Sequence, residues 1–204
     1  MSRRRLLIAT GSAHKLAELS EMLDLPNTDL VSLADVGLSD TAEEIGHTFL
    51  ENAQIKADHY AQLSGLPTLA DDSGIEVDYL DGRPGVFTRR YAGPDATDAD
   101  NNDKLLAELS GVEPSRRTGR YRCVLVMVDS SIGLRLEADG TFEGQVALAP
   151  RGTEGFGYDP IFEPSTEPSG GRTVGQLSPQ EKNAISHRAI AARSMRAQLI
   201  AKGY

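Results

Sequence analysis

Two adjacent aspartates, Asp71 and Asp72, are the residues of this chain best suited to do chemistry, and Ser73 and Gly74 follow them. Neighbouring carboxylates repel each other unless a cation or hydrogen-bond donors neutralise them, and a divalent metal does this well. Side chains of adjacent residues in an extended chain point to opposite faces, so we expect the two aspartates to have different roles. The pattern indicates either a metal-assisted reaction centre or a polar turn in which aspartate caps its own backbone.

The sequence around the aspartates predicts two strands with the acidic pair between them. An apolar stretch, residues 66–70, leads into the pair, and residues 75–80 alternate apolar and acidic side chains, which is typical of a half-buried strand. Gly74 would supply an unusual backbone angle at the junction. We therefore expect one strand to end before Asp71 and another to begin after Gly74.

A possible anion site lies near the start of the chain. Residues 5–9 form an apolar run that predicts a buried strand, and leucines at positions 16, 19 and 23 have helical spacing. Ser12 suits the cap position of that helix, so the turn presents backbone amides to an anion. Lys15 lies in the first helical turn, where the helix dipole disfavours a cation. Its side chain either binds a phosphate or points into water.

A second helix carries two further polar candidates. Thr48 and Glu51 form a capping box that predicts where the helix starts, and Gly65 predicts where it ends. Asn52 and Lys56 share one face of this helix because they are four residues apart. That face is either solvated or part of a site.

The second half of the chain predicts an antiparallel meander, with strands near residues 121–129, 133–138 and 141–149. A helix capped by Thr97 precedes these strands. A glycine-rich loop follows them over residues 152–164. Its aromatic rings, which lie beside glycines, could stack on a flat heterocycle or pack as in an ordinary loop.

The C-terminal helix is predicted to begin at Ser178, with Pro179 in its first turn. Lys182 and Arg188 would face different directions on one straight helix, because they are six residues apart. If both reach one ligand, the helix must break, and Ser186 could cap a second segment. Otherwise these side chains form a solvated basic face.

Composition limits the classes of protein that fit. The 204 residues suffice for one large domain or for two lobes that share a core. A formal net charge of −9 argues against a nucleic-acid polymer or an anionic membrane as partner. The single cysteine allows no intrachain disulfide, and the four histidines lack zinc-ligand spacing. We see no membrane span or signal peptide and expect a cytoplasmic protein.

Taken together, these stretches resemble the inosine/xanthosine triphosphate pyrophosphatase family, and the resemblance runs from Leu6 to about Ala192. The pieces occur in family order, and the ordered set is far more specific than any one piece. They are Ala9-Thr10-Gly11-Ser12-Ala13-His14-Lys15, Glu44-Ile45-Gly46-His47-Thr48-Phe49, Glu51-Asn52-Ala53, Lys56-Ala57, Ala70-Asp71-Asp72-Ser73-Gly74, Pro84-Gly85-Val86, Arg90-Tyr91-Ala92-Gly93, Gly155-Phe156-Gly157-Tyr158-Asp159-Pro160, Glu181-Lys182-Asn183 and Ser186-His187-Arg188.

The resemblance implies a fold and an activity. The fold is a single α/β domain over residues 1–204, with an elongated, mixed central β-sheet flanked by helices and a cleft between two lobes. The activity is magnesium-dependent hydrolysis of non-standard purine nucleoside triphosphates, such as ITP, dITP and XTP, to the monophosphate and pyrophosphate. The resemblance also implies a homodimer.

The resemblance further implies a role for each matching residue. Glu44 and Asp72 would bind magnesium, Asp72 would also activate the attacking water, and Ser73 would contact the substrate. The triphosphate would be held by Thr10, Gly11, Ser12, Ala13, His14, Lys15 and Lys56. The purine pocket would be formed by Phe156, Gly157, Tyr158, Asp159, Lys182, His187 and Arg188. Because a guanidinium only donates hydrogen bonds, Arg188 would read the 6-oxo group of the base.

Two departures from the family pattern and two other readings stay open. Ser12 replaces the usual asparagine, and Gln176 lies where many members have a carboxylate. A nucleotide sensor without catalysis could share this fold, although it would have less need of Asp72 and Glu44. A pyrophosphatase for modified pyrimidine nucleotides is the other reading, and the purine-pocket residues argue against it.

We predict that Lys15→Ala mainly weakens triphosphate binding, because it removes the cation at the start of the first helix. Ser12→Asn, which restores the family residue, should be nearly neutral. Apparent affinities of both variants for a nucleoside triphosphate test this. An unchanged affinity for every nucleotide in Lys15→Ala would show that this turn is not the phosphate site.

Overall fold

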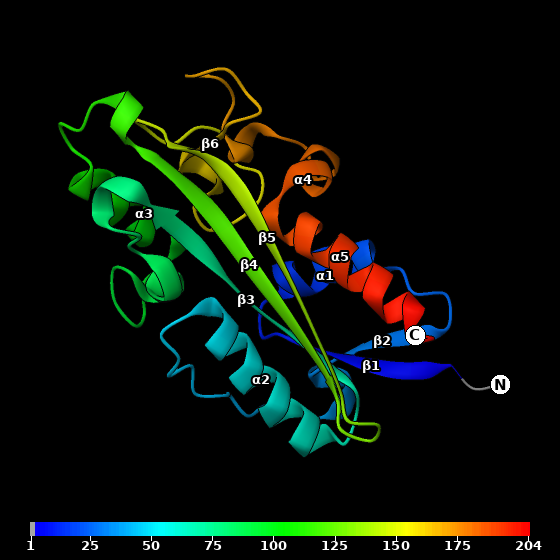
Figure 1. The fold of residues 1–204 in the computed structure, drawn as a ribbon. Coiled ribbons are helices and arrows are strands. Elements are labelled where there is room, and N and C mark those ends of the chain that lie inside the picture. The colour runs from blue at the N-terminus through cyan, green and yellow to red at the C-terminus, as the bar shows by residue number, and fades with distance from the viewer. Residues whose placement is uncertain (1–2) are drawn as a thin grey trace. The chain divides into compact units, whose positions relative to one another are not determined.

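The computed structural model describes residues 3–204. Across this range it contains six β-strands and five α-helices (Figure 1). In chain order they are β1 (Arg4–Ala9), α1 (Ala13–Leu23), β2 (Thr28–Ser32), α2 (Phe49–Ser64), β3 (Thr68–Val77), α3 (Asp98–Glu108), β4 (Thr118–Asp129), β5 (Leu134–Val146), β6 (Phe162–Pro164), α4 (Pro179–Ile185) and α5 (His187–Ala201). Within residues 3–204, none of the helices has the length and apolar character needed to span a bilayer.

The six strands form one mixed sheet in the order β2-β1-β3-β4-β5-β6. β1 runs parallel to both β2 and β3, whereas β5 and β6 are antiparallel. In the β1–β3 register Ala9 pairs with Ala70. The turn that follows β1 therefore begins beside the two aspartates of β3. The mixed sheet flanked by helices confirms the predicted α/β class.

The chain divides into two compact units, and β3, β4 and β5 pass from one into the other. The first unit comprises Met1–Asp72, Cys123–Gly140 and His187–Tyr204. Its core is formed by apolar side chains of β1, β3, β4, α1 and α5, and α1 contacts α5 directly. Fully buried members of this core include Leu6, Ile8, Leu69, Leu125, Met195 and Leu199.

The second unit comprises Ser73–Arg122 and Thr141–Ser186. Its core has a strong aromatic component, in which the rings of Tyr121 and Phe162 meet edge to face at a centroid distance of 4.8 Å. The ring of Phe142 lies 5.7 Å from that of Phe162. Such pairs add to the stabilisation that burial alone provides. The short strand β6 thus supplies an anchor for the loop that precedes it.

Helix boundaries follow the predicted caps closely. The Ser12 side chain accepts a hydrogen bond from the Lys15 amide at 3.4 Å, and Thr48, Thr97 and Ser178 each form a complete capping box. Of the two alternatives for the C-terminal helix, the one with a break at Ser186 is observed, because Ser186 has extended backbone angles (φ −68°, ψ 159°) between α4 and α5. Local side-chain chemistry was sufficient to predict these features.

The predicted junction at the aspartates is wrong. β3 runs without interruption from Thr68 to Val77, so Asp71, Asp72 and Gly74 all lie in extended backbone inside one strand. The predicted strand over residues 75–80 also ends early, because Asp78–Leu80 forms a 3₁₀ turn. Two buried carboxylates can occupy a strand here because cations from other elements neutralise them, and sequence spacing alone does not show this.

The predicted meander also needs correction. The two strands expected over residues 133–138 and 141–149 are one long strand, β5, and it ends at Val146. Gly140, between the two expected strands, lies where helix α5 approaches the sheet. The strand β6 was not predicted, because three residues in a loop rich in glycine and proline carry no periodic signal.

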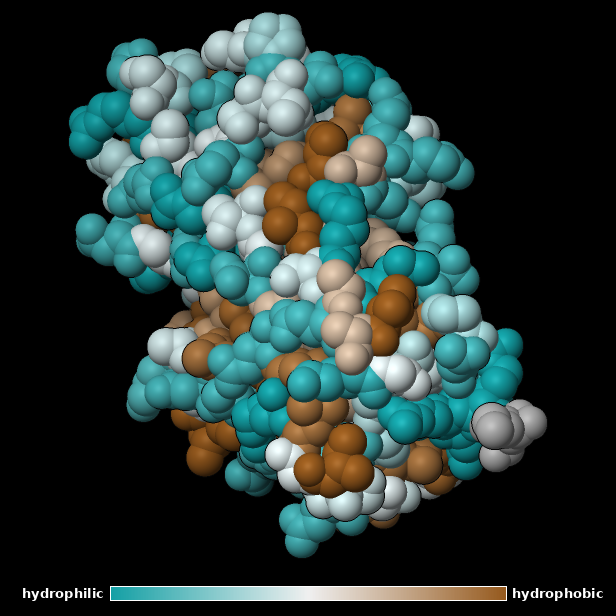
Figure 2. Space-filling view, turned by 45° about the vertical axis from the view of Figure 1, so that its right-hand side comes forward, coloured by the Kyte–Doolittle hydropathy of each residue, from teal (hydrophilic) through white to brown (hydrophobic). Residues whose placement is uncertain are grey.

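The molecular surface is mainly hydrophilic on the face seen in Figure 2, with separate hydrophobic patches. Large exposed apolar side chains include Ile45, Phe87, Ile132 and Leu148. Isolated apolar side chains at the surface are ordinary in globular proteins. They therefore do not by themselves indicate a docking site.

We predict that Gly140→Ala destabilises the protein by about 1–3 kcal/mol. A Cβ atom at this position would lie 2.2 Å from the carbonyl oxygen of His187 and 2.8 Å from the amide nitrogen of Ala191, and backbone atoms cannot move away cheaply. Gly11→Ala is the control, because its Cβ would meet nothing within 4 Å. Urea unfolding measures both free energies. Equal stabilities would contradict the close approach of α5 to β5.

Candidate active site

Asp71 and Asp72 are both buried, with 2% and 7% of their surfaces exposed. Because they are consecutive residues of β3, their side chains point to opposite faces of the sheet. Asp71 pairs with residues of α1 and α5, and Asp72 pairs with residues of α2. The two carboxylates therefore have different surroundings, and their different roles stay a prediction.

Asp72 shares a single cation with a second carboxylate. The Nζ atom of Lys56 lies 2.9 Å from Oδ1 of Asp72 and 2.9 Å from Oε1 of Glu44. Lys56 comes from α2, and Glu44 comes from the loop that precedes this helix. The other oxygen of Asp72, Oδ2, accepts a hydrogen bond from Asn52 Nδ2 at 3.3 Å. The face shared by Asn52 and Lys56 is thus part of a polar centre and is not solvated.

This environment changes the protonation equilibria of the cluster. Burial raises the pKa of Asp72, and the attraction of Lys56 offsets only part of that rise. Burial acts to lower the pKa of Lys56, but the nearby carboxylates outweigh it, and the net pKa is raised. Lys56 therefore stays protonated. A carboxylate with a raised pKa is a stronger base than an ordinary aspartate, which suits proton abstraction.

Asp71 occupies the opposite kind of environment. Its Oδ2 atom lies 3.0 Å from Lys15 Nζ and 3.6 Å from Arg188 Nη2. Burial acts to raise the pKa of Asp71, but Lys15 and Arg188 together bring it well below its usual value. Arg188, which is 1% exposed, also pairs with Glu18 of α1. Asp71 is therefore a permanent anion that fixes two cations in place.

The turn between β1 and α1 lies next to this ion pair. The Ser12 amide donates to Thr10 Oγ1 at 3.2 Å, and Ser12 Oγ caps the helix. Residues 10–15 therefore form an ordered helix start, and Lys15 keeps 20% of its side-chain surface exposed. The partner of Lys15 in this structure is Asp71, and its exposed part leaves it accessible to an anion from solvent.

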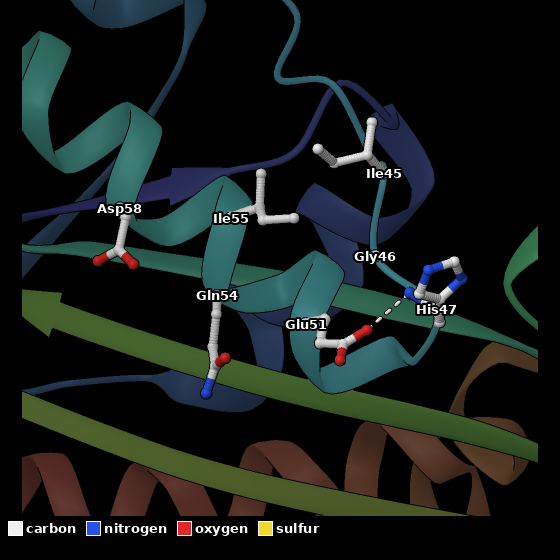
Figure 3. A pocket seen from close by; sticks show the side chains of 7 residues that line it. All are labelled: Ile45, Gly46, His47, Glu51, Gln54, Ile55 and Asp58. Atoms are coloured by element: carbon white, nitrogen blue, oxygen red, sulfur yellow. Dashed lines mark hydrogen bonds between the residues drawn. The ribbon is translucent and has the colours of Figure 1, made fainter.

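The loop that carries Glu44 is tied to the first turn of α2 (Figure 3). Glu51 Oε2 accepts hydrogen bonds from the amides of His47 and Thr48 at 2.6 and 3.1 Å. A hollow of about 380 Å³ lies outside this loop. Its lining consists of Ile45, Gly46, His47, Glu51, Gln54, Ile55 and Asp58, and it includes neither Glu44 nor Lys56. The hollow is therefore distinct from the polar cluster.

The second unit brings Phe156, Asp159 and Lys182 together. Asp159 Oδ2 accepts hydrogen bonds from Lys182 Nζ at 2.8 Å and from the Phe156 amide at 2.9 Å. The ammonium of Lys182 also lies 4.4 Å from the centre of the Phe156 ring. Tyr121 donates to Asp159 Oδ1 at 3.2 Å, and burial raises the pKa of Tyr121 strongly. The carboxylate of Asp159 thus orders the ring and the ammonium together.

The glycine-rich loop is also held by α3. The Gly157 amide donates to Asp98 Oδ2 at 2.7 Å, and Asn102 Nδ2 donates to the Gly157 carbonyl at 3.1 Å. Tyr158 is buried, and its hydroxyl donates to the carbonyl of Thr88 at 2.8 Å. Sequence reasoning predicted this helix but not its contact with the loop. Sequence reasoning also missed Glu18 and Tyr121, which carried no signal beyond ordinary helix or strand positions.

Ser73, His187 and Gln176 lie in different elements of the structure. Ser73 continues β3 as the first residue of the second unit, and His187 is a buried residue at the start of α5 in the first unit. Gln176 caps a 3₁₀ turn by accepting from the Thr173 amide at 3.1 Å. A structural role therefore accounts for Gln176, the residue that departs from the family pattern.

The donor set around Lys56 is compatible with a hard divalent cation. Within residues 3–204 no cluster of three or more histidine, cysteine, aspartate or glutamate side chains is arranged as a metal site. Glu44 and Asp72, however, converge on one positive charge, the Lys56 ammonium. Magnesium is commonly bound by one or two carboxylates together with water and substrate phosphates. Two carboxylates are therefore sufficient on the protein side.

Comparison with known proteins gives consistent matches over nearly the whole chain. The model of the Ham1 family matches residues 6–198. A Methylococcus capsulatus protein named dITP/XTP pyrophosphatase is 46% identical over 97% of this chain and 96% of its own length. The structure of a HAM1 protein from Coxiella burnetii superposes with a TM-score of 0.85, at 43% identity, over 97% of this chain and 98% of that one.

A third match is a solved structure described as a nucleoside-triphosphatase / dITP/XTP pyrophosphatase, from Mycobacterium abscessus. It has a TM-score of 0.75 and 40% identity, and it covers 96% of this chain and 98% of its own. The family resemblance seen in the sequence motifs is therefore confirmed by both sequence and structure.

We predict that Asp71→Asn costs about 3–5 kcal/mol of stability at pH 7, because it removes the buried anion that pairs with Arg188 and with the partly exposed Lys15. The pKa of Asp71 is lower in the folded protein than in the unfolded chain. Its contribution is therefore complete above pH about 4 and is lost as the pH falls below that value. Urea unfolding at pH 7 and pH 3 should show a smaller acid effect in the variant than in the wild type.

Asp58→Asn is the matched control for this experiment, because Asp58 forms an exposed ion pair with Arg135. Exposed pairs contribute about 0–1 kcal/mol. If Asp71→Asn were as mild as Asp58→Asn, the buried ion network would not stabilise the fold.

Proposed function

We propose that this chain, which belongs to the Ham1 family, hydrolyses the non-standard purine nucleotides dITP and XTP to the monophosphate and pyrophosphate. The observation that carries the proposal is the cluster in which Lys56 lies between the carboxylates of Asp72 and Glu44. A buried lysine, a carboxylate with a raised pKa and a second carboxylate are the groups that phosphoryl chemistry requires for charge neutralisation and proton transfer.

The triphosphate would be held by groups of the first unit. Backbone amides at the start of α1 and the partly exposed Lys15 provide positive potential for phosphate oxygens. Lys56 would add a second cation if a phosphate replaced one of its two carboxylate partners. The ion pair with Asp71 holds Lys15 in place, so part of the entropy of ordering that side chain is already lost before substrate binds.

Glu44 and Asp72 would hold magnesium, which neutralises phosphate charge when bound. The protein contributes a fixed pair of oxygen ligands, and Lys56 provides a compensating charge between them. The raised pKa of Asp72 equips its carboxylate to accept a proton from the attacking water. Release of pyrophosphate requires that this water attack the α-phosphorus, after which the proton resides on a carboxylate oxygen.

In the second unit, the base would be recognised by Phe156, Gly157, Tyr158, Asp159 and Lys182. The ordered Phe156 ring offers a face for stacking, and Lys182 is a donor held beside it. Arg188 would donate to the 6-oxo group of hypoxanthine or xanthine, a role that rests on the family resemblance. Dimer formation and a cytoplasmic location belong to the same proposal and also rest on that resemblance.

Pyrophosphate release from ITP, dITP, XTP, ATP, GTP and pyrimidine triphosphates tests the function. We expect turnover of dITP, ITP and XTP to exceed that of the standard nucleotides, and excess EDTA to abolish it. A nucleotide sensor would bind without releasing pyrophosphate. A pyrimidine-specific enzyme would release it from the pyrimidine triphosphates instead.

We predict that Asp72→Asn lowers turnover of dITP at least about a hundredfold, the usual contribution of a general base, while the protein stays folded. Binding of dITP should persist because Lys15 and Lys56 remain. Turnover, equilibrium binding and urea unfolding would be measured together, with Asp58→Asn as the control. Near-normal turnover by folded Asp72→Asn would remove Asp72 from the role of base.

A further inference from the structure

We infer that Asn52 is a positioning residue that sets the geometry of Asp72 and fixes the loop bearing Glu44. This inference rests on the proposed function, because it assigns Asn52 a role in the chemistry of those carboxylates. Asn52 lies in the first turn of α2 and has no exposed surface. A buried side-chain amide needs partners for both its donor and its acceptor, so what it contacts is informative.

Both ends of the Asn52 amide are used, and they reach different elements. Its Nδ2 donates to Asp72 Oδ2 on β3 at 3.3 Å, and its Oδ1 accepts from the Gly46 amide at 2.8 Å. Lys56 Nζ already holds the other oxygen of Asp72 at 2.9 Å. With one donor on each oxygen, the plane of the Asp72 carboxylate cannot rotate freely.

The second contact acts on the loop, two residues after Glu44. Gly46 packs so tightly on α2 that an added Cβ would lie 2.7 Å from Asn52 Oδ1 and 2.7 Å from Glu51 Cβ. The next two amides donate to Glu51: that of His47, as Figure 3 shows, and that of Thr48. Three consecutive amides therefore end on side chains of residues 51 and 52. This arrangement fixes where Glu44 can lie relative to Asp72.

Asparagine is the residue type that this position requires. One small planar group must donate to a carboxylate and accept from an amide, and the asparagine amide has both functions. Aspartate would keep the acceptor for Gly46 but would face Asp72 with a negative charge and no donor. Leucine has a similar volume but would leave both partners unsatisfied in a buried place. The two substitutions therefore separate the Asp72 contact from the Gly46 contact.

The test compares Asn52→Asp and Asn52→Leu with wild type in dITP turnover. We expect kcat to fall about ten- to a hundredfold in Asn52→Asp, the effect of losing one hydrogen bond to a charged group, and at least as much in Asn52→Leu, which also loses the Gly46 contact. KM should change by less than about threefold, because Lys15, Lys56 and the α1 turn are intact. Gly46→Ala, which displaces the Asn52 amide from the other side, should give the same pattern.

Asn101 is the matched control, because it is also buried and bridges two backbone groups. Its Nδ2 donates to the Arg89 carbonyl at 2.9 Å, and its Oδ1 accepts from the Ala92 amide at 2.8 Å. Asn101→Asp should lower stability in urea without the selective loss of kcat.

Three results would overturn the inference. One is a kcat within twofold of wild type in folded Asn52→Asp. Another is a loss of activity in the Asn52 variants that is fully explained by the fraction of the protein that is unfolded. The third is an equal loss of kcat in Asn101→Asp. If wild type itself released no pyrophosphate from any nucleotide, the proposed function would fail instead, so the two failures are distinguishable.

Discussion

Two consecutive buried carboxylates in the middle of β3 are the constraint on which the first unit depends. An unpaired charge in a protein interior costs several kcal/mol, so each carboxylate needs a cation at close range. Lys15 of α1 and Arg188 of α5 meet Asp71 on one face of the sheet, and Lys56 of α2 meets Asp72 on the other. The packing of α1, α2 and α5 against β3 therefore brings in the cations that neutralise the two carboxylates of this strand.

The same constraint separates the two aspartates chemically. Two cations lower the pKa of Asp71, whereas Asp72 shares its single lysine with Glu44 and keeps a raised pKa. A carboxylate that stays ionised at all working pH values suits the holding of cations. A carboxylate whose negative charge is only partly compensated by a nearby cation suits proton transfer. The difference arises from the number of cations on each face, because both side chains are almost fully buried.

Sequence reasoning succeeded where the cause of a structure is local. Caps at Ser12, Thr48, Thr97 and Ser178 were predicted because the residues that make them lie within three positions of each other. The continuous strand β3 was not predicted, because two adjacent aspartates suggest a turn unless the lysines and the arginine that neutralise them are known to be nearby. Those cations lie between 16 and 117 residues away in sequence from the carboxylates that they neutralise, as Lys56 from Asp72 and Arg188 from Asp71 show. The family resemblance supplied candidate site residues that spacing could not.

A buried carboxylate organises the second unit in a similar way, and this explains why sequence patterns could not decide which neutral side chains support the buried carboxylates of the two units. Asp159 gathers Lys182, Tyr121 and the Phe156 amide, as Asp72 gathers Lys56 and Asn52. In each case one partner is a cation with a visible charge and another is a neutral donor. A neutral donor leaves no mark in a hydropathy pattern, since asparagine or tyrosine also occurs on solvated helix faces and in cores. Its importance follows from the satisfaction of every buried oxygen, which only the folded chain reveals.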